Sequence, residues 1–393
     1  MNNKLTSSTI ILEKKRYLYE KIISIAICSY PILSIYKIGP IPLSFLIVLF
    51  ILVFEYVFGY KRIFKNKSFL IFMVLVFFQH VITVFLYKNN VKIITNLASL
   101  VSSFLFIILV SSSGLGKKTF LKIYTIFAIL SAVGIFYQSF FVYILDESVG
   151  PLVFRPFIAY PDLVVNTLNR PMSFFPEPQA FASYVIPLFF LQIKRKKYPL
   201  VVFLLASIIL SGSSLGIIAA LLIVIISVPS LDIKAIHKTG LVMMVLFIFA
   251  IFMLSPIFEY SREKLFTIDF SNNQRLTSGF YNYTQISTFE KIFGVGRGNF
   301  LTHYPSANTE YMTTFSSLLV YNGILVTISF MCFLLSIFFN GSREVKHFVV
   351  IYFILTFGQT ILFNPIGDFY MFIIIFIYTF RKEVSSYDKE ESF

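Results

Sequence analysis

The sequence contains no tryptophan, only two cysteines and few charged residues. Charged residues make up 13% of the 393 positions, about half the share of a typical soluble domain. Hydrophobic residues make up 57%, and the mean hydropathy is +0.81. No single water-soluble core could bury so much apolar surface, so a soluble globular fold is excluded. Cys28 and Cys332 both lie inside apolar segments, so the sequence indicates neither a disulfide framework nor a redox compartment.

The hydrophobic residues fall in blocks of about 15 to 25, the length that a helix needs to cross a hydrocarbon core ~30 Å thick. Continuous rather than alternating hydrophobicity favours helices over a barrel. The sequence therefore predicts an all-α, polytopic integral membrane protein, a single membrane domain over 1–393 with about 12 transmembrane helices. We expect the spans at 22–36, 41–58, 68–87, 93–112, 119–145, 179–193, 198–211, 213–228, 239–256, 309–338, 347–363 and 365–380.

The seventh and eighth spans are short and meet at Ser211-Gly212-Ser213-Ser214. A broken or re-entrant element is therefore the alternative interpretation of that pair.

The orientation follows from lysine and arginine, because basic residues that flank spans stay on the cytoplasmic side. With both termini in the cytoplasm, about two thirds of the 33 basic residues lie in the tails and the short inner connections, while the 19 acidic residues divide almost evenly. The formal net charge of +14 thus reports orientation, and a nucleic-acid partner is not needed to explain it. We expect a multi-pass plasma-membrane protein with both termini cytoplasmic.

Two outer connections are long, 146–178 and 257–308, and loops of that length in compact proteins are usually functional. The first carries six prolines among apolar residues and is expected to lie along the membrane interface. The second is predicted to hold a helix that Ser271 or Asn272 can cap. The apolar stripe of this helix consists of Leu276, Phe280, Tyr283 and Ile286.

The first loop offers two candidate residues for chemistry. The Arg170 guanidinium can bind two oxygens of a phosphate at once, although an arginine at this position can instead extend to lipid headgroups. Glu177 lies between two prolines and is expected close to apolar surface, which makes it a candidate acid or base. The alternative role of Glu177 is an ion pair with Arg170 that holds the loop.

The second loop offers Arg275 on the predicted helix and Arg297 in a glycine turn. Gly294 and Gly296 in that turn would let backbone N–H groups approach an anion, as in a phosphate-binding nest; an ordinary membrane-surface turn is the alternative. His303 is the one histidine of the outer loops. An imidazole suits proton transfer near neutrality, and a structural role is the alternative.

The outer loops lack HExxH, GxSxG, clustered His or Cys ligands and an Asp-x-Asp pair, and the chain has no P-loop or dinucleotide fingerprint. We therefore expect no metal and no cofactor. Outside the cytoplasm there is no ready supply of ATP or nucleotide sugars, so a donor must arrive already activated. A sugar on a membrane lipid diphosphate fits, because several arginines would stabilise the departing diphosphate charge.

Three features occur in the order seen in the bacterial O-antigen polymerase (Wzy) family, within the O-antigen polymerase and ligase superfamily. The segment 170–182 resembles the family's signature of an arginine followed by Phe-x-Glu-Pro-x-x-Phe-Ala. The second feature is Arg275 followed by the run 293–300. The third is Asn308-x-Glu310-Tyr311 leading to Asn322-Gly323-Ile324.

The resemblance implies a metal-independent glycosyltransferase at the outer leaflet of the bacterial inner membrane. It would move the growing glycan from undecaprenyl diphosphate onto an incoming undecaprenyl-diphosphate-linked oligosaccharide repeat unit. Arg170 and Arg275 would engage lipid diphosphate. We expect further partners to be membrane lipids, a chain-length regulator and a flippase. The substrate-binding residues expected are Arg297, Gly294, Gly296, Asn308, Glu310 and Tyr311.

Two rival functions remain. Ligases that join the glycan to lipid A core place a histidine directly before the Asn-x-x-Tyr stretch, where this chain has Ala307, so the sequence favours a polymerase. For the same reason the general base stays open between His303 and Glu177. A flippase of lipid-linked sugars is the rival from another class. Ion-coupled transporters usually carry ionisable residues deep in their spans, whereas Glu55 and Asp368 are predicted near span ends, and His80 is the deepest candidate.

The predicted topology places positions 170 and 275 in the same non-cytoplasmic compartment. Cysteines introduced at both positions should react in intact cells with a thiol reagent that does not cross membranes, whereas a cysteine at Lys118 should react only after the membrane is opened. Labelling of 170 and 275 from opposite sides would contradict the topology.

Overall fold

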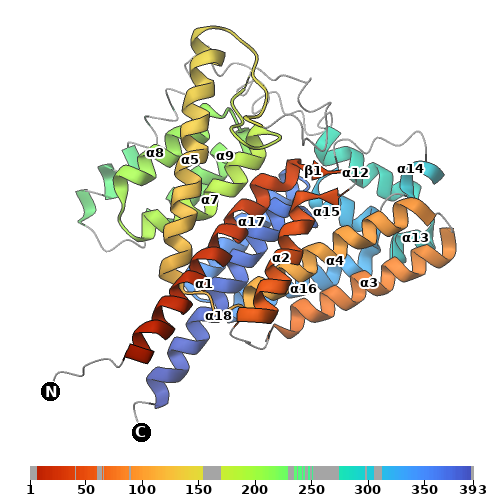
Figure 1. Ribbon diagram of the computed structural model, residues 1–393. Helices are drawn as coiled ribbons and strands as arrows, with labels where there is room; N and C mark the ends of the chain where they lie inside the picture. Colours follow the sequence, from red (N-terminus) through yellow and green to blue (C-terminus); the bar gives the residue numbers. More distant parts are fainter. Residues whose placement is uncertain are drawn as a thin grey trace.

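The computed structural model describes residues 7–39, 41–59, 64, 66–87, 90–153, 170–228, 234–236, 238–240, 242–243, 247, 250, 274–296, 299–304 and 312–390. Of residues 7–13, 90–95, 274–277, 301–302 and 380–390 it describes the backbone alone. Figure 1 shows that the described chain is almost entirely helical, which confirms the all-α prediction.

Helices occupy almost all of the predicted membrane segments. They are α1 (Ser7–Ile32), α2 (Leu43–Phe58), α3 (Lys67–Tyr87), α4 (Asn90–Ser112), α5 (Lys117–Ile144), α7 (Pro178–Lys194), α8 (Tyr198–Leu210), α9 (Ser214–Ser227), α16 (Gly323–Asn340), α17 (Arg343–Gly358) and α18 (Pro365–Glu390). The predicted span 239–256 lies largely outside the described residues. α1 begins well before the predicted start at residue 22, because its basic N-terminal part continues the same helix.

Four stretches of the described chain are long and apolar enough to cross a membrane: Lys14–Ile35, Lys67–Tyr87, Lys117–Ile144 and Thr314–Asn340. Five shorter apolar helices accompany them, among them α8 with 13 residues and α9 with 14. A helix of that length rises only about 20 Å, so α8 and α9 are each shorter than a hydrocarbon core ~30 Å thick. The helices are those of a membrane protein; the number of crossings stays a prediction.

The remaining elements are short and lie between these helices. They are the 3₁₀ turn η1 (Leu33–Ile35), strands β1 (Lys37–Ile38) and β2 (Ile41–Pro42), α12 (Gln274–Gln285), α13 (Thr288–Phe293), α14 (Phe300–His303), α15 (Thr314–Ser317) and the π-helical turn η5 (Leu318–Asn322). The two strands form one antiparallel pair in which Lys37 opposes Pro42. A helix is present in the second loop as predicted, namely α12, but it ends at Gln285, so Ile286 of the predicted apolar stripe lies beyond it. The predicted caps Ser271 and Asn272 lie outside the described residues.

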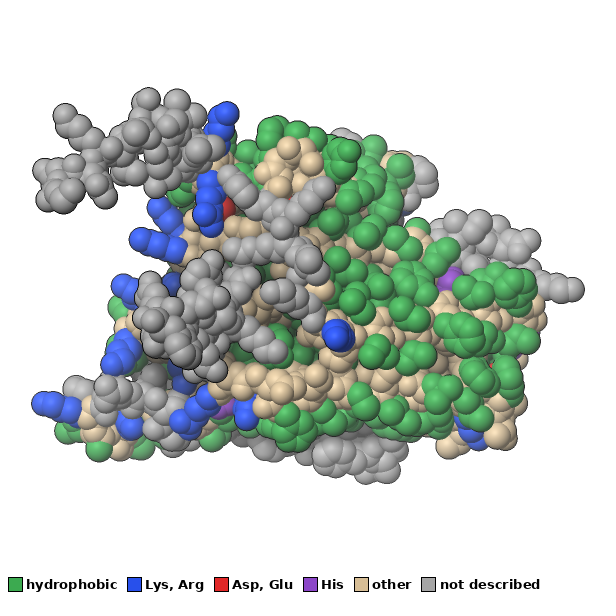
Figure 2. All heavy atoms as spheres, turned by 90° about the horizontal axis from the view of Figure 1, so that it is seen from below, with side chains coloured by type: hydrophobic (Ala, Val, Ile, Leu, Met, Phe, Trp, Pro, Cys, Tyr) green, Lys and Arg blue, Asp and Glu red, His purple; other side chains and the backbone are tan. Residues whose placement is uncertain are grey.

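The two ends of the helix bundle differ in charge. Figure 1 places the start of α1 and the end of α18 at the same end of the bundle, and α1 packs against α18. Figure 2 shows most of the visible lysine and arginine side chains gathered toward that end. Connections far apart in sequence meet there, because Lys194 and Arg343 both lie near the His347 ring. The structure thus groups several basic connections that the sequence assigned to one face.

A dense aromatic core holds the middle of the bundle. The fully buried Phe72 of α3 has ring contacts with Phe104, Phe330, Phe333 and Phe363, which come from α4, α16 and the turn before α18. Aromatic pairs in offset or edge-to-face geometry stabilise packing beyond the area that they bury. This core therefore fixes how α3, α16 and the turn between α17 and α18 lie relative to one another.

The helix that leads into α16 is interrupted by the π-turn η5. A backbone carbonyl of this turn accepts a hydrogen bond from α3. Gln79 of α3 donates from Nε2 to the Tyr321 carbonyl at 2.8 Å and accepts from Asn322 Nδ2 at 2.9 Å. Both side chains are buried. A buried backbone group without a partner would destabilise the fold by about 1–3 kcal/mol. The hydrogen bonds between Gln79 and the turn remove this cost.

Two glycines lock the π-turn against the turn after α13. Gly294 has φ +79° and Gly323 has φ +77°. A Cβ atom on Gly294 would overlap the Tyr321 carbonyl oxygen, and one on Gly323 would overlap the Ile292 carbonyl oxygen. Only glycine allows both this backbone conformation and this close approach. Two of the three motif segments in the predicted resemblance are therefore in direct contact.

We predict that Gly294→Ala destabilises the protein more than Gly39→Ala. Gly39 has φ +59° but nothing within 4 Å of its added Cβ, so alanine there meets only the conformational cost of about 1–2 kcal/mol. Alanine at 294 adds a steric overlap that typically costs a further ~1–3 kcal/mol. The free energy of unfolding, measured by denaturant titration in detergent micelles, checks this. Equal losses in the two variants would contradict the interlock.

Candidate functional site

The end of the first loop is held against α5 by one buried glutamine. Gln138 Oε1 accepts from the backbone N–H groups of Met172 at 2.8 Å and Ser173 at 2.6 Å, and its Nε2 donates to the Gly150 carbonyl at 2.7 Å. Gly134, one turn earlier on α5, leaves the space that Ser173 fills. A side chain of α5 thus ties both described parts of the loop, 146–153 and 170–177, to one helix face.

Arg170 lies further along α5, near its C-terminal end. The guanidinium interacts electrostatically with Tyr143, whose hydroxyl donates to the Leu210 carbonyl at 2.8 Å. Tyr143 is five residues beyond Gln138, which corresponds to about 7.5 Å along the helix. Arg170 is half-buried there, between the ends of α5 and α8.

Glu177 is the N-cap residue of α7, with Pro178 at the first helical position. Its backbone carbonyl accepts from Ala180 and Phe181, so its side chain is not needed as a cap. The carboxylate is exposed and has no hydrogen-bond partner in the described part of the chain. The loop therefore presents Glu177 to the space outside α7, and not against apolar surface as its sequence neighbours suggested.

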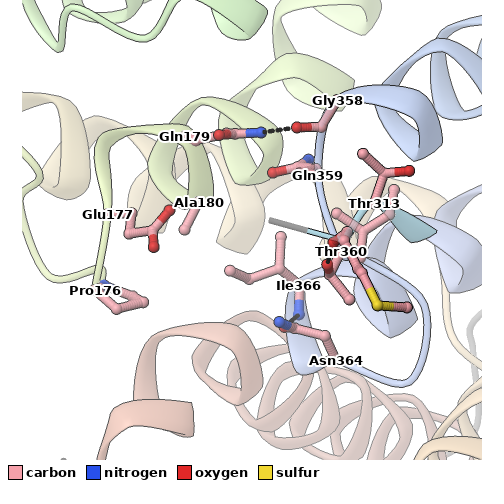
Figure 3. A pocket seen from close by; sticks show the side chains of 12 residues that line it. Pro176, Glu177, Gln179, Ala180, Thr313, Gly358, Gln359, Thr360, Asn364 and Ile366 are labelled. Atoms are coloured by element: carbon pink, nitrogen blue, oxygen red, sulfur yellow. Dashed lines mark hydrogen bonds between the residues drawn. The ribbon is translucent and has the colours of Figure 1, made fainter. Parts of the chain in front are cut away.

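That space is a cavity of about 200 Å³ (Figure 3). One wall is the start of α7, from Pro176 to Ala180, and the other walls are Met312 and Thr313 before α15 and the segment 358–366 between α17 and α18. Figure 3 shows Glu177 and Pro176 across an open space from Asn364, Thr360 and Ile366. Three separate parts of the chain therefore meet at this cavity.

Hydrogen bonds between these walls fix the shape of the cavity. Thr314 donates from its backbone N–H at 3.0 Å and from its hydroxyl at 2.7 Å to the Gln359 carbonyl, and its Oγ1 accepts from the Ile361 N–H at 2.7 Å. Gln359 Nε2 donates to the Ser183 hydroxyl of α7. Gln179 of α7 donates to the Gly358 carbonyl at 3.1 Å. The start of α7, α15 and the turn after α17 thus form one rigid frame.

The second loop reaches the same cavity through α12. Phe280 packs on Phe315 of α15, and a Cβ on Gly279 would overlap the Ser316 side chain. Asn282 donates from Nδ2 to the sulfur of Met312, which lines the cavity. The described parts of the two long loops therefore converge on one place.

A buried carboxylate organises the rest of the second loop. Glu290 of α13 accepts hydrogen bonds from the hydroxyls of Tyr87 at 2.6 Å and Tyr304 at 2.7 Å, and from the Ser287 N–H at 2.9 Å. Burial alone would raise the pKa of Glu290, but these hydrogen bonds outweigh it and hold the pKa below its ordinary value. Burial, followed by the bond to Glu290, raises the pKa of Tyr304 to about 12.

His303 belongs to this cluster and not to the cavity. Its ring is exposed and lies 4.6 Å, between centroids, from the ring of Tyr87. Of the two residues between which the sequence left the general base open, Glu177 lines the cavity and His303 does not.

The glycine turn does not offer the anion nest that we expected from residues 294–296. The N–H groups of Gly294, Val295 and Gly296 donate to the carbonyls of Glu290 at 2.7 Å, Val320 at 3.0 Å and Tyr321 at 2.9 Å. The Val295 and Gly296 donors pack the turn onto η5 and the Gly294 donor closes the end of α13, so these three N–H groups have a structural role. Substrate binding by Gly294 and Gly296 stays a prediction.

Several predicted site residues lie outside the described residues. They are Arg297, Asn308, Glu310 and Tyr311, together with the side chain of Arg275, whose backbone lies in the first turn of α12. Their roles stay predictions. No group of three or more His, Cys, Asp or Glu side chains is arranged to hold a metal among the residues that the structure describes.

Sequence reasoning missed the polar residues that complete the cavity. Gln359, Thr360 and Asn364 interrupt two apolar segments, and that interruption was a readable signal. The expected span 347–363 instead ran through Gln359 and Thr360, whereas α17 ends at Gly358. Gln138 gave no signal of its own, because a single glutamine in an apolar helix does not reveal which loop it binds.

Comparison with known proteins finds no matching family model and no similar curated protein. The resemblance to the O-antigen polymerase family therefore stays a prediction that rests on the motifs and on the geometry described above.

We predict that the stabilising effect of Glu290 is lost at low pH. Because the folded pKa is below the ordinary value of ~4.3, the ionised carboxylate stabilises the fold fully above that pH, and this stability disappears as the pH falls through the lower folded pKa. The difference in melting temperature between wild type and Glu290→Gln should be constant from neutral pH to about pH 5 and shrink below pH ~4.3. Glu147→Gln, which removes an exposed loop carboxylate, is the matched control. A difference that grows on acidification would contradict the assignment.

Proposed function

We propose that this protein is a polymerase of lipid-linked polysaccharide repeat units, a membrane glycosyltransferase that works without a metal. The observation that supports it most is the position of Glu177. This carboxylate faces a cavity whose other polar groups are uncharged amides and hydroxyls, at the place where the two long loops converge. Such groups suit the hydroxyls of a sugar, and a carboxylate without competing partners suits a general base.

The proposed reaction is a single displacement. A hydroxyl oxygen of the incoming repeat unit attacks the anomeric carbon of the growing glycan, and its proton passes to the Glu177 carboxylate. The new carbon–oxygen bond forms as the bond from the anomeric carbon to the diphosphate oxygen breaks, and the electron pair leaves with undecaprenyl diphosphate. Glu177 then returns the proton to water. The atoms and charges balance without a metal or a second cofactor.

In this proposal the arginines act on the leaving group. The half-buried Arg170 guanidinium stays charged at any working pH and can bind two diphosphate oxygens. Arg170 does not line the cavity, so in this proposal it binds the diphosphate outside the space that holds the acceptor hydroxyl. Arg275 on α12 is proposed to act in the same way from the second loop.

We predict that Glu177→Gln lowers the rate of chain extension by about 10²–10⁴-fold, because it removes the proton acceptor, and that Arg170→Ala lowers it by about 10²–10³-fold. The measurement uses purified protein, lipid-linked repeat units and a chelator, followed by separation of the lipid-linked chains by length. Glu147→Gln and Arg343→Ala, both exposed charges outside the cavity, are the matched controls and should extend chains at the wild-type rate.

Normal chain lengths from correctly folded Glu177→Gln would exclude Glu177 as the base. A wild-type protein that makes no longer chains under any of these conditions would exclude the polymerase.

A further inference from the structure

The cavity beside Glu177 is richer in hydrogen-bond acceptors than in donors. Glu177 offers two carboxylate oxygens. Gln359 uses its Nε2 on Ser183, which leaves its Oε1 as an acceptor, and Thr360 donates its proton to the Met312 carbonyl, which leaves oxygen lone pairs. Against these acceptors stand the two Nδ2 hydrogens of Asn364, whose Oδ1 accepts from the Ile366 N–H at 3.1 Å, and the second Nε2 hydrogen of Gln359.

Backbone donors do not change this balance. The N–H groups of Ala180, Thr314 and Ile361 all donate to protein atoms. Thus the Ala180 and Thr314 N–H groups at the starts of α7 and α15 are not available to an anion, although both helices begin at the cavity. A phosphate, which brings only acceptors, would meet acceptors on most sides.

The cavity carries a negative charge in addition to its hydrogen-bond acceptors. Glu177 is its one charged lining residue in the part of the chain that the structure describes. A ligand with a carboxylate would place a second negative charge in the same small space, and like charges close together disfavour each other. A ligand with several hydroxyl groups, or with an ammonium group, matches both the acceptors and the charge.

The volume of the cavity limits its occupant to a single sugar ring. About 200 Å³ is below the range of about 300–1,000 Å³ in which drug-sized ligands are bound, so an oligosaccharide does not fit inside the walls. One sugar ring is the natural occupant, and the rest of a longer glycan must leave through the open side.

We infer that this cavity is a subsite for the single terminal sugar of the acceptor, and that it selects an uncharged or amino sugar and rejects an acidic one. The inference rests on the proposed function and deepens it. Gln359, Thr360 and Asn364 orient the sugar hydroxyls, and Glu177 both receives the reacting proton and excludes uronic acids. The lipid diphosphate binds elsewhere, toward Arg170.

The test is protection of a cysteine placed in the cavity wall. Thr360 is exposed, so Thr360→Cys is reachable by a small maleimide, and Cys332→Ser removes the exposed native thiol while Cys28 stays buried. Labelling rates are measured for the full-length protein in detergent with methyl glycosides of neutral hexoses, hexosamines and hexuronic acids, and with inorganic phosphate. Glu147→Cys in the same background reports labelling outside the cavity.

At least one neutral hexoside or hexosamine should slow labelling at 360 and not at 147. Its uronic acid counterpart should need at least about tenfold higher concentration, because of repulsion from Glu177. Adding Glu177→Gln should bring the uronide to within about threefold of the neutral glycoside, which a merely structural role of Glu177 would not do. Protection by phosphate, equal protection by the uronide in the Glu177 protein, or no protection by any sugar would each overturn the inference.

The two proposals fail in different ways. Chain extension by purified protein without sugar protection at 360 would leave the polymerase standing and remove the subsite. Selective protection by neutral sugars without chain extension would leave a sugar-binding cavity and remove the polymerase.

Discussion

The whole arrangement depends on one constraint: polar backbone groups that leave a regular helix inside a membrane protein must find partners within the protein, because hydrocarbon offers none. Three side chains meet this need at the three irregular places described here. Gln79 satisfies the π-turn before α16, Gln138 holds the ends of the first loop, and Thr314 joins the start of α15 to the turn after α17. Each one also fixes a wall or a loop near the candidate site. The polar ties that keep the fold intact are thus the same ones that position the functional groups.

The cavity and the Glu290 cluster differ in how far their polar groups are already hydrogen-bonded within the protein. Loop residues around Glu290 satisfy their hydrogen bonds among themselves and with Tyr87, so that cluster is internally complete and suits a structural role. At the cavity, Glu177, Gln359 and Asn364 keep hydrogen-bonding capacity that the described protein does not use. Unused capacity in a rigid frame is what a binding site requires, because the ligand then supplies the missing partners without rearranging the walls.

Particular residues show which features of the fold and of the site could be predicted from the sequence. The helices were predictable because apolar blocks of fixed length, bounded by charge or proline, report membrane segments directly. Glu177 was predictable as a candidate because two prolines flank it in a loop. The Gln79–Asn322 pair joins positions 243 residues apart, and no single-sequence pattern reveals such a partner. Gly294 and Gly296 show a related limit: a glycine run signals close approach, but the sequence does not say whether an anion or another backbone comes close.

The length of α7 has one more consequence. Its 17 residues rise about 25 Å from the basic segment at Lys194 to Glu177, which is less than the depth of an ordinary hydrocarbon core. Under the proposed function, the acceptor sugar would have to reach below the headgroup level of a membrane of usual thickness to meet Glu177. The thickness of the surrounding bilayer would then help to set the rate of turnover.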